Sequence, residues 1–207
     1  MKPDNAAATR KIEKTVAAIA RGKQLFSSDS GMQDFNRGCD HIHGLLRDSY
    51  TLFSANSPGS SAFLAITAIE EIAKLEVAMF RSHRQTPSYK RKDDLLFNHK
   101  AKHSIALQEV ICIGTRLPQA IGEKRLRELL DMAETGKLVE LRESALYTDN
   151  INGRFVCPAD LISRQLAREL LLLALEVWDD RLVGLTDHTY EIDTELLLTF
   201  QSISVST

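Results

Sequence analysis

Cysteine is scarce in this chain, which has three in 207 residues, at Cys39, Cys112 and Cys157. An odd number at such wide spacing matches neither a disulfide framework nor a zinc module, which favours a reducing compartment. Long apolar runs are also missing: the longest is 170–175, whereas about 20 apolar residues are needed to span a bilayer. The opening residues, MKPDNAAATRK, lack the apolar segment of a secretory signal. We therefore expect a cytoplasmic protein with no membrane partner.

Several catalytic templates are absent as well. The chain has no glycine-rich phosphate loop, no serine at a nucleophile elbow and no cysteine paired with a plausible base, so hydrolase and nucleotide-kinase templates lack support. No Glu-x-x-His pair occurs, which argues against a di-iron bundle. His99 and His103 stand one helical turn apart and could bind zinc, but no Glu follows His99 in the metalloprotease manner. We expect neither a metal ion nor another cofactor.

Charge is nearly balanced overall, at a net −2, but it is unevenly distributed along the chain. Basic residues outnumber acidic ones in residues 1–102, and the reverse holds in residues 103–207. The basic excess is concentrated in two stretches, 10–23 and 81–102. These stretches could contact nucleic-acid phosphate, although the acidic half argues against extensive wrapping of nucleic acid. The alternative is that both are solvated surfaces without a ligand.

The hydrophobic pattern predicts helices along most of the chain, with apolar residues recurring at three- and four-residue steps. We expect helices at about 6–26, 32–53, 59–83, 92–115, 123–147, 158–183 and 191–200, the fifth of them either continuous or divided at Gly136. Pro58 suits the start of the third helix, Pro87 a break after it and Pro118 the end of the fourth, while the segment NING at 150–153 could support a short hairpin. The sequence therefore predicts an all-α bundle in residues 31–207, preceded by a basic helical extension in residues 1–30.

The third predicted helix carries its charged residues in a narrow sector. Apolar side chains cover a wide arc of this helix, and Glu70, Glu71 and Lys74 fall in the remainder. One interpretation is an ordinary ion pair between Glu70 and Lys74, which would contribute little stability. The other is that the sector faces an internal cleft, where Lys74 keeps both carboxylates ionised and the three side chains form a fixed polar network.

The fourth predicted helix offers related side chains. His99 and His103 share one face of it, and Lys102 lies at the edge of that face. The histidines are either hydrogen-bonded core residues or part of a polar site that includes the charged sector of the third helix.

A third group of polar residues lies at the end of the helix predicted near residue 147. Arg142 suits bidentate contact with phosphate, Tyr147 could hydrogen-bond or stack on a base, and Asp149 could orient either of them. The alternative is an arginine that closes on local carbonyl groups beside a half-buried tyrosine.

The order of these motifs resembles one known family. A helix of the form A-x-x-A-x-x-x-EE-x-x-K, then His99-Lys100-Ala101-Lys102, then the ending R-x-x-x-LY-x-D are similar to the signatures of the abortive-infection V (AbiV) family, over about residues 36–181. AbiV proteins are grouped with the HEPN superfamily. The resemblance implies an all-α HEPN-like helical bundle, commonly a homodimer, that acts in antiphage defence in the bacterial cytoplasm by shutting down phage or host gene expression.

The resemblance also implies a candidate chemistry. Many HEPN proteins are metal-independent endoribonucleases in which an R-x4–6-H motif supplies an arginine for the scissile phosphate and a histidine that assists attack by the ribose 2′-OH. Here the residue five positions after Arg142 is Tyr147, a poor general base because the ordinary pKa of tyrosine is about 10. His99 or His103 could supply the missing imidazole.

We therefore state two hypotheses. In the first, the protein acts on RNA or translation, with catalytic residues Arg142, Tyr147, His99, Glu70, Glu71 and Lys74 and RNA-binding residues Arg142, Lys102 and Asp149. In the second, which the missing motif histidine favours, the protein is not an enzyme and binds a phage protein or a translation-related host protein.

Overall fold

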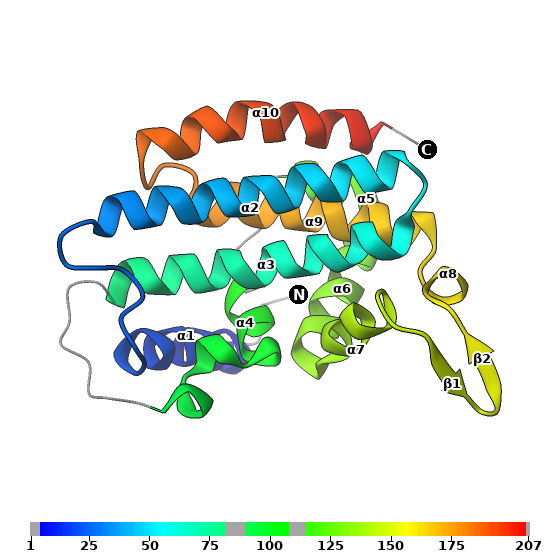
Figure 1. Cartoon of the computed structure of the whole chain (residues 1–207), viewed down its shortest axis with the longest axis horizontal. Helices are drawn as coiled ribbons and strands as arrows, with labels where there is room; N and C mark the ends of the chain where they lie inside the picture. Colours follow the sequence, from blue (N-terminus) through cyan, green and yellow to red (C-terminus); the bar gives the residue numbers. More distant parts are fainter. Residues whose placement is uncertain (1–4, 82–89, 108–114, 206–207) are drawn as a thin grey trace.

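The computed structural model describes residues 5–81, 90–107 and 115–205, and these residues are almost entirely helical (Figure 1). Its elements are α1 (Asn5–Ala20), α2 (Gly31–Ser54), α3 (Pro58–Arg81), the 3-10 turns η1 (Arg91–Asp93) and η2 (Leu95–Phe97), α4 (His99–Ala106), α5 (Arg116–Ile121), α6 (Glu123–Thr135), α7 (Lys137–Ser144), β1 (Asp149–Ile151), β2 (Arg154–Val156), α8 (Pro158–Leu161), α9 (Arg164–Leu182) and α10 (Asp187–Ser204). The prediction of an all-α bundle is confirmed.

Helix α3 lies at the centre of the bundle. It packs against α2 and α9 on one side and against α1, α4 and α7 on the other, while α10 covers α2 and α9 (Figure 1). Its isoleucines Ile66, Ile69 and Ile72 are fully buried, as is Trp178 of α9. Helices that are apolar on most sides are stable only when neighbours cover them, which explains the central position of α3 and α9. No described helix is long and apolar enough to cross a bilayer.

The first helix is shorter than predicted, and the buried side chain of Arg81 forms hydrogen bonds with carbonyl groups at and beyond its end. Helix α1 ends at Ala20 rather than near residue 26, and the chain then runs without regular structure to α2. The guanidinium group of Arg81, fully buried at the end of α3, donates hydrogen bonds to the carbonyl oxygens of Ala18, Arg21 and Lys23, and to both carboxylate oxygens of Asp94. This junction attaches the N-terminal helix to α3. The division at residue 30 stays a prediction.

The prediction of one helix over 92–115 is wrong in the part that the structure describes. Asp94 accepts a hydrogen bond from the amide of Leu96, and Asn98 accepts one from the amide of Ala101, so that these side chains cap η2 and α4. Such side chains compete with the helical backbone and favour starts over interiors. Pro118 lies in the first turn of α5 and ends no helix. The predicted break around Pro87 lies outside the described residues.

The remaining boundaries follow local turn chemistry. Gly136, at φ +91°, separates α6 from α7, and Asn152 and Gly153 adopt the positive φ angles of the predicted hairpin turn. The prediction of one helix over 158–183 is wrong, because Ser163 accepts a hydrogen bond from the amide of Leu166 and starts a new helix, α9. Helix α10 is longer than predicted and begins where Thr186 caps it.

Candidate functional site

The centre of the candidate site is the carboxylate of Glu70, which is only 2% exposed. The central helix α3 carries it toward α4. Its Oε2 atom accepts a hydrogen bond from Lys102 Nζ at 2.6 Å and lies 2.7 Å from His99 Nδ1. Because Lys102 and His99 are three residues apart on α4, one carboxylate oxygen binds both side chains.

The second oxygen of Glu70 faces two further cationic or titratable groups. Glu70 Oε1 lies 3.0 Å from His103 Nε2 and 3.7 Å from Arg142 Nε. These approaches permit electrostatic attraction, but neither has hydrogen-bond geometry, so Oε1, both His103 ring nitrogens and Arg142 Nε have no hydrogen-bond partner among the described residues. Buried polar atoms usually have such partners. The Glu70 cluster therefore has buried hydrogen-bonding capacity that the described residues leave unused.

The electrostatics of this cluster favour an anion. Burial alone would raise the pKa of Glu70, but the adjacent His103 and Lys102 side chains outweigh the effect of burial and lower that pKa to about 2. Glu70 thus contributes one negative charge at neutral pH. Two cationic side chains, Lys102 and Arg142, lie within 4 Å of this single carboxylate. The excess of positive charge is suited to phosphate.

Arg142 and His99 are the two partly exposed side chains of the cluster, and each is positioned by a neighbouring side chain. The guanidinium carbon of Arg142, on α7, lies 4.8 Å from the centre of the Phe63 ring, and its side chain is 22% exposed. The His99 side chain is 44% exposed. Since its Nδ1 atom faces Glu70, its Nε2 atom is the one left for contact with a ligand.

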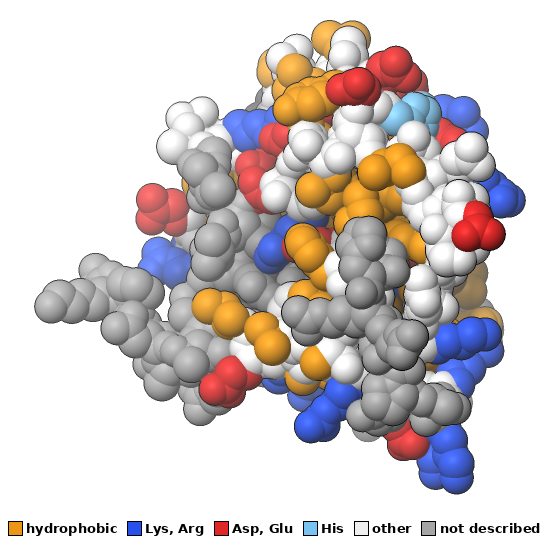
Figure 2. Space-filling view, turned by 90° about the vertical axis from the view of Figure 1, so that its left-hand side faces the viewer, with side chains coloured by type: hydrophobic (Ala, Val, Ile, Leu, Met, Phe, Trp, Pro, Cys, Tyr) orange, Lys and Arg blue, Asp and Glu red, His pale blue; other side chains and the backbone are white. Residues whose placement is uncertain are grey.

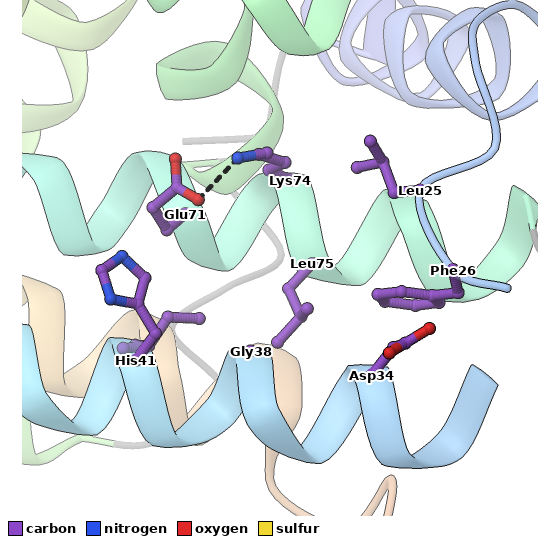
Figure 3. Close-up of a pocket in the computed structure, with 9 residues that line it drawn as sticks. Leu25, Phe26, Asp34, Gly38, His41, Glu71, Lys74 and Leu75 are labelled. Atoms are coloured by element: carbon purple, nitrogen blue, oxygen red, sulfur yellow. Dashed lines mark hydrogen bonds and ion pairs between the residues drawn. The ribbon is translucent and has the colours of Figure 1, made fainter. Parts of the chain in front are cut away.

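The predicted network of Glu70, Glu71 and Lys74 is divided by the structure. Lys74 Nζ donates to Glu71 Oε2 at 2.8 Å, and no Glu70–Lys74 ion pair forms among the described residues. Glu71 and Lys74 instead line a cavity of about 340 Å³, whose other walls come from α2 and from the linker that precedes it (Figure 3). Glu70 and Glu71 have different neighbours because successive side chains of a helix point about 100° apart.

A family model of HEPN type, described as AbiV, matches residues 38–179 of this chain. The chain belongs to the AbiV family. The match includes Glu70, His99, Lys102 and Arg142, and it places the protein among those of abortive infection, a form of antiphage defence. A search of curated proteins and a search of solved structures each found no match.

The other predicted residues of this AbiV-family protein lie apart from the Glu70 carboxylate. Tyr147 follows the end of α7 and is 64% exposed. Asp149 is exposed on β1, where it accepts a hydrogen bond from the amide of Asn150. No described contact joins either residue to Glu70, His99 or Arg142, so the roles predicted for Tyr147 and Asp149 stay predictions.

Two further side chains contribute to the cluster. His103, which the sequence offered beside His99 as a source of an imidazole, is fully buried next to Glu70. Phe63, which supports Arg142, looks like any apolar residue of α3 in the sequence, and only its contact reveals it. Among the described residues, no group of three or more His, Cys, Asp or Glu side chains could hold a metal ion.

Proposed function

We propose that this AbiV-family protein defends bacteria against phage as a metal-independent endoribonuclease of the cytoplasm, with Glu70, His99, Lys102 and Arg142 in its active site. The observation that carries the proposal is the position of His99. A buried carboxylate holds its Nδ1 atom at 2.7 Å, and two cations lie on the same carboxylate group.

His99 is suited to act as the general base. A carboxylate hydrogen-bonded to Nδ1 orients an imidazole and stabilises the imidazolium that forms when Nε2 takes a proton. This imidazole replaces the one that an R-x4–6-H motif would supply after Arg142. Tyr147 is not needed for proton transfer in this scheme.

The reaction that follows is a transesterification within RNA. His99 Nε2 removes the proton of a ribose 2′-OH, and the 2′ oxygen attacks the adjacent phosphorus. The bond from phosphorus to the 5′ oxygen breaks, and that oxygen takes a proton from solvent. Arg142 and Lys102 would stabilise the negative charge that accumulates on the phosphate oxygens. The products are a 2′,3′-cyclic phosphate and a 5′-hydroxyl group.

A second candidate function rests on the apolar hairpin. Phe155 and Ile151 are 67% and 42% exposed on β2 and β1, and Tyr147 precedes them. Exposed apolar side chains of this kind fit a protein partner, either a phage or translation-related host protein or a second copy in a homodimer. In this case the Glu70 cluster would stabilise the fold and would not act on RNA.

The deciding experiment compares matched arginine variants on total bacterial RNA, with and without EDTA. Arg142→Ala removes the proposed phosphate contact. Arg164→Ala is the control, because Arg164 also lies over a phenylalanine ring, at 4.1 Å from the centre of Phe53, outside the cluster. We expect EDTA-resistant cleavage by the wild type and by Arg164→Ala, and about 100- to 1,000-fold slower cleavage by Arg142→Ala.

The products and a histidine pair complete the test. Fragments should carry 2′,3′-cyclic phosphate ends, and His99→Ala should abolish them. His188→Ala is the matched control, since His188 also lies 2.7 Å from a carboxylate, that of Asp40. Intact RNA in every lane, including reactions with lysate of phage-infected cells, would favour the protein-binding function.

A further inference from the structure

A second cavity lies beside the linker that joins α1 to α2. It has a volume of about 460 Å³ and is lined by Lys23, Gln24, Leu25, Arg91, Asp94 and Phe97. Ligand pockets for small molecules have volumes in this range, roughly 300–1,000 Å³. Figure 2 views the molecule from the side on which this linker lies in Figure 1, and hydrophobic side chains are exposed there among Lys and Arg side chains.

The one acidic side chain of this lining is already neutralised. Asp94 is 3% exposed, and Arg81 donates to its Oδ1 and Oδ2 atoms at 2.7 and 2.8 Å. The amides of Lys23 and Leu96 also donate to this carboxylate. The acidic group therefore repels an incoming anion only weakly.

The rim of the cavity keeps its positive charge. Lys23 and Arg91 are both exposed, and neither side chain forms an ion pair among the residues that the structure describes. The exposed side chains of Lys90 and Lys92 flank Arg91 on either side in the sequence. Exposed lysine and arginine side chains are the groups through which proteins contact nucleic-acid phosphate.

An aromatic side chain, Phe97, also lines the cavity. The ring of Phe97 is 36% exposed, and the guanidinium carbon of Arg91 lies 4.4 Å from its centre. Leu25 adds an apolar wall. Proteins that bind single-stranded nucleic acid combine such elements, since bases stack on aromatic rings and on arginine while cations contact the backbone.

The cavity is close to the proposed active site. Phe97 precedes His99 by two residues, so their Cα atoms lie at most about 7.6 Å apart. We propose that the cavity is a subsite for single-stranded RNA, in which one base stacks on Phe97 and Arg91 while Lys23 and Arg91 contact phosphate. This inference rests on the proposed function and names the strand next to the cleaved bond as its ligand.

The test measures binding without cleavage. A fluorescein-labelled, unstructured 2′-O-methyl RNA oligonucleotide cannot react through its 2′ oxygen, and fluorescence anisotropy gives its Kd. We expect Phe97→Leu and Arg91→Ala each to weaken binding about tenfold, and Phe97→Trp to retain it, because stacking needs a ring. In a plot of the logarithm of the association constant against the logarithm of the salt concentration, the slope should be less negative by about 0.7 in Arg91→Ala than in the wild type. This is the change expected when one phosphate contact of a single strand is lost.

Two control variants lie outside the cavity. Phe155→Leu changes another exposed phenylalanine, and Arg127→Ala removes another exposed arginine. Both should bind the oligonucleotide as the wild type does. If these controls weaken binding as much as the cavity variants, or if the cavity variants bind normally, the subsite proposal is wrong.

Further arms separate the possible outcomes. AMP at millimolar concentration tests a free nucleotide: if AMP binds in a Phe97-dependent manner and the oligonucleotide does not bind, the RNA proposal is wrong. If the oligonucleotide depends on Phe97 and Arg91 while natural RNA is never cleaved, the subsite stands and the nuclease proposal falls. If natural RNA is cleaved at the same rate by the wild type and by the Phe97 and Arg91 variants, the subsite proposal is wrong and the nuclease proposal stands.

Discussion

At the scale of single residues, Glu70 and Glu71 show how strongly the surroundings decide what a carboxylate does. Glu70 is almost fully buried and lies within 4 Å of four basic or titratable side chains. Glu71 is adjacent in sequence but forms a partly exposed pair with Lys74. Breaking a buried ion pair leaves a charge without compensation, whereas an exposed pair contributes little.

Glu70→Gln should therefore destabilise the protein far more than Glu71→Gln. We expect Glu70→Gln to lower the free energy of unfolding by roughly 3–5 kcal/mol, because Lys102 stays buried without its partner. Glu71→Gln should cost about 1 kcal/mol or less. Urea denaturation of both variants measures the difference, and equal losses would show that the Glu70 cluster is not a cooperative network.

The same carboxylate predicts an acid limit of stability. The pKa of Glu70 is about 2 in the folded protein, below its ordinary value of 4.5, so folding favours the ionised form. Its contribution is present above about pH 4.5 and is lost as the pH falls toward 2, which amounts to roughly 3 kcal/mol. Urea denaturation at a series of pH values should show this loss in the wild type, and a Glu70→Gln profile equally steep between pH 4.5 and 2 would contradict it.

At the scale of elements, the protein depends on junctions at helix ends. The junction of Arg81 and Asp94 connects the end of α1, the end of α3 and the start of η2, which leads into α4. Helix α4 carries His99 and Lys102. The position of the candidate site therefore depends on contacts at the opposite end of η2, and on the loop geometry at Gly22.

Gly22→Ala should loosen this junction. Gly22 has φ +135°, and an added Cβ atom would lie 2.4 Å from the buried Arg81 guanidinium. We expect a loss of about 1–3 kcal/mol in stability. Gly44→Ala is the control, because Gly44 lies within α2 with nothing within 4 Å of an added Cβ atom, and a gain of about 0.5–1 kcal/mol is expected. Thermal unfolding compares the two variants. An unchanged Tm in Gly22→Ala would mean that the junction adjusts to the added Cβ atom without loss of stability.

The end of α9 predicts a second pH dependence. Burial, with Glu176 and Asp179 nearby, raises the pKa of Asp180 to about 7. A raised pKa means that folding favours the neutral acid, so this group destabilises the protein as the pH rises from 4 to above 7. Asp180→Asn should remove that decline, and should be more stable than the wild type at pH 8. Unfolding curves at pH 5 and pH 8 test it; an unchanged pH dependence would contradict the prediction.

At the scale of the whole molecule, the bundle brings distant segments of the chain to one carboxylate. His99 on α4 and Arg142 on α7 meet at Glu70 because both short helices pack against α3. The match to the AbiV family covers all three residues. Antiphage defence by this protein should then depend on the cluster and not merely on a folded bundle.

Phage protection in cells tests this dependence. Arg142→Ala should abolish protection while the helical circular-dichroism signal and Tm stay close to those of the wild type, since Arg142 Nε has no hydrogen-bond partner among the described residues. Arg164→Ala should still protect. Plaque counts on cells that express each variant measure the effect, and full protection by Arg142→Ala would remove Arg142 from the functional site.

Much of the fold follows from local pattern. The periodic apolar residues of α2 and α3 and the proline at the start of α3 were predicted, and the division at Gly136 and the hairpin at NING were among the stated alternatives, because each depends on neighbours within a few residues. The predictions failed where a capping side chain, Asp94, Asn98 or Ser163, interrupted an otherwise helical pattern. Capping depends on a balance of weak local hydrogen bonds that hydrophobic periodicity does not report.

Periodicity, composition and motif order were enough to establish the all-α class, the family resemblance and the chemical types of the candidate residues, because these properties need no knowledge of packing. The packed structure was needed to show that Glu70, and not the Glu70–Lys74 pair, is the centre of the cluster, and that His103 lies within the cluster while Tyr147 and Asp149 lie apart from it. Helical spacing shows which residues share a face, but the packing of α4 and α7 on α3 determines which charged side chains lie close enough to pair.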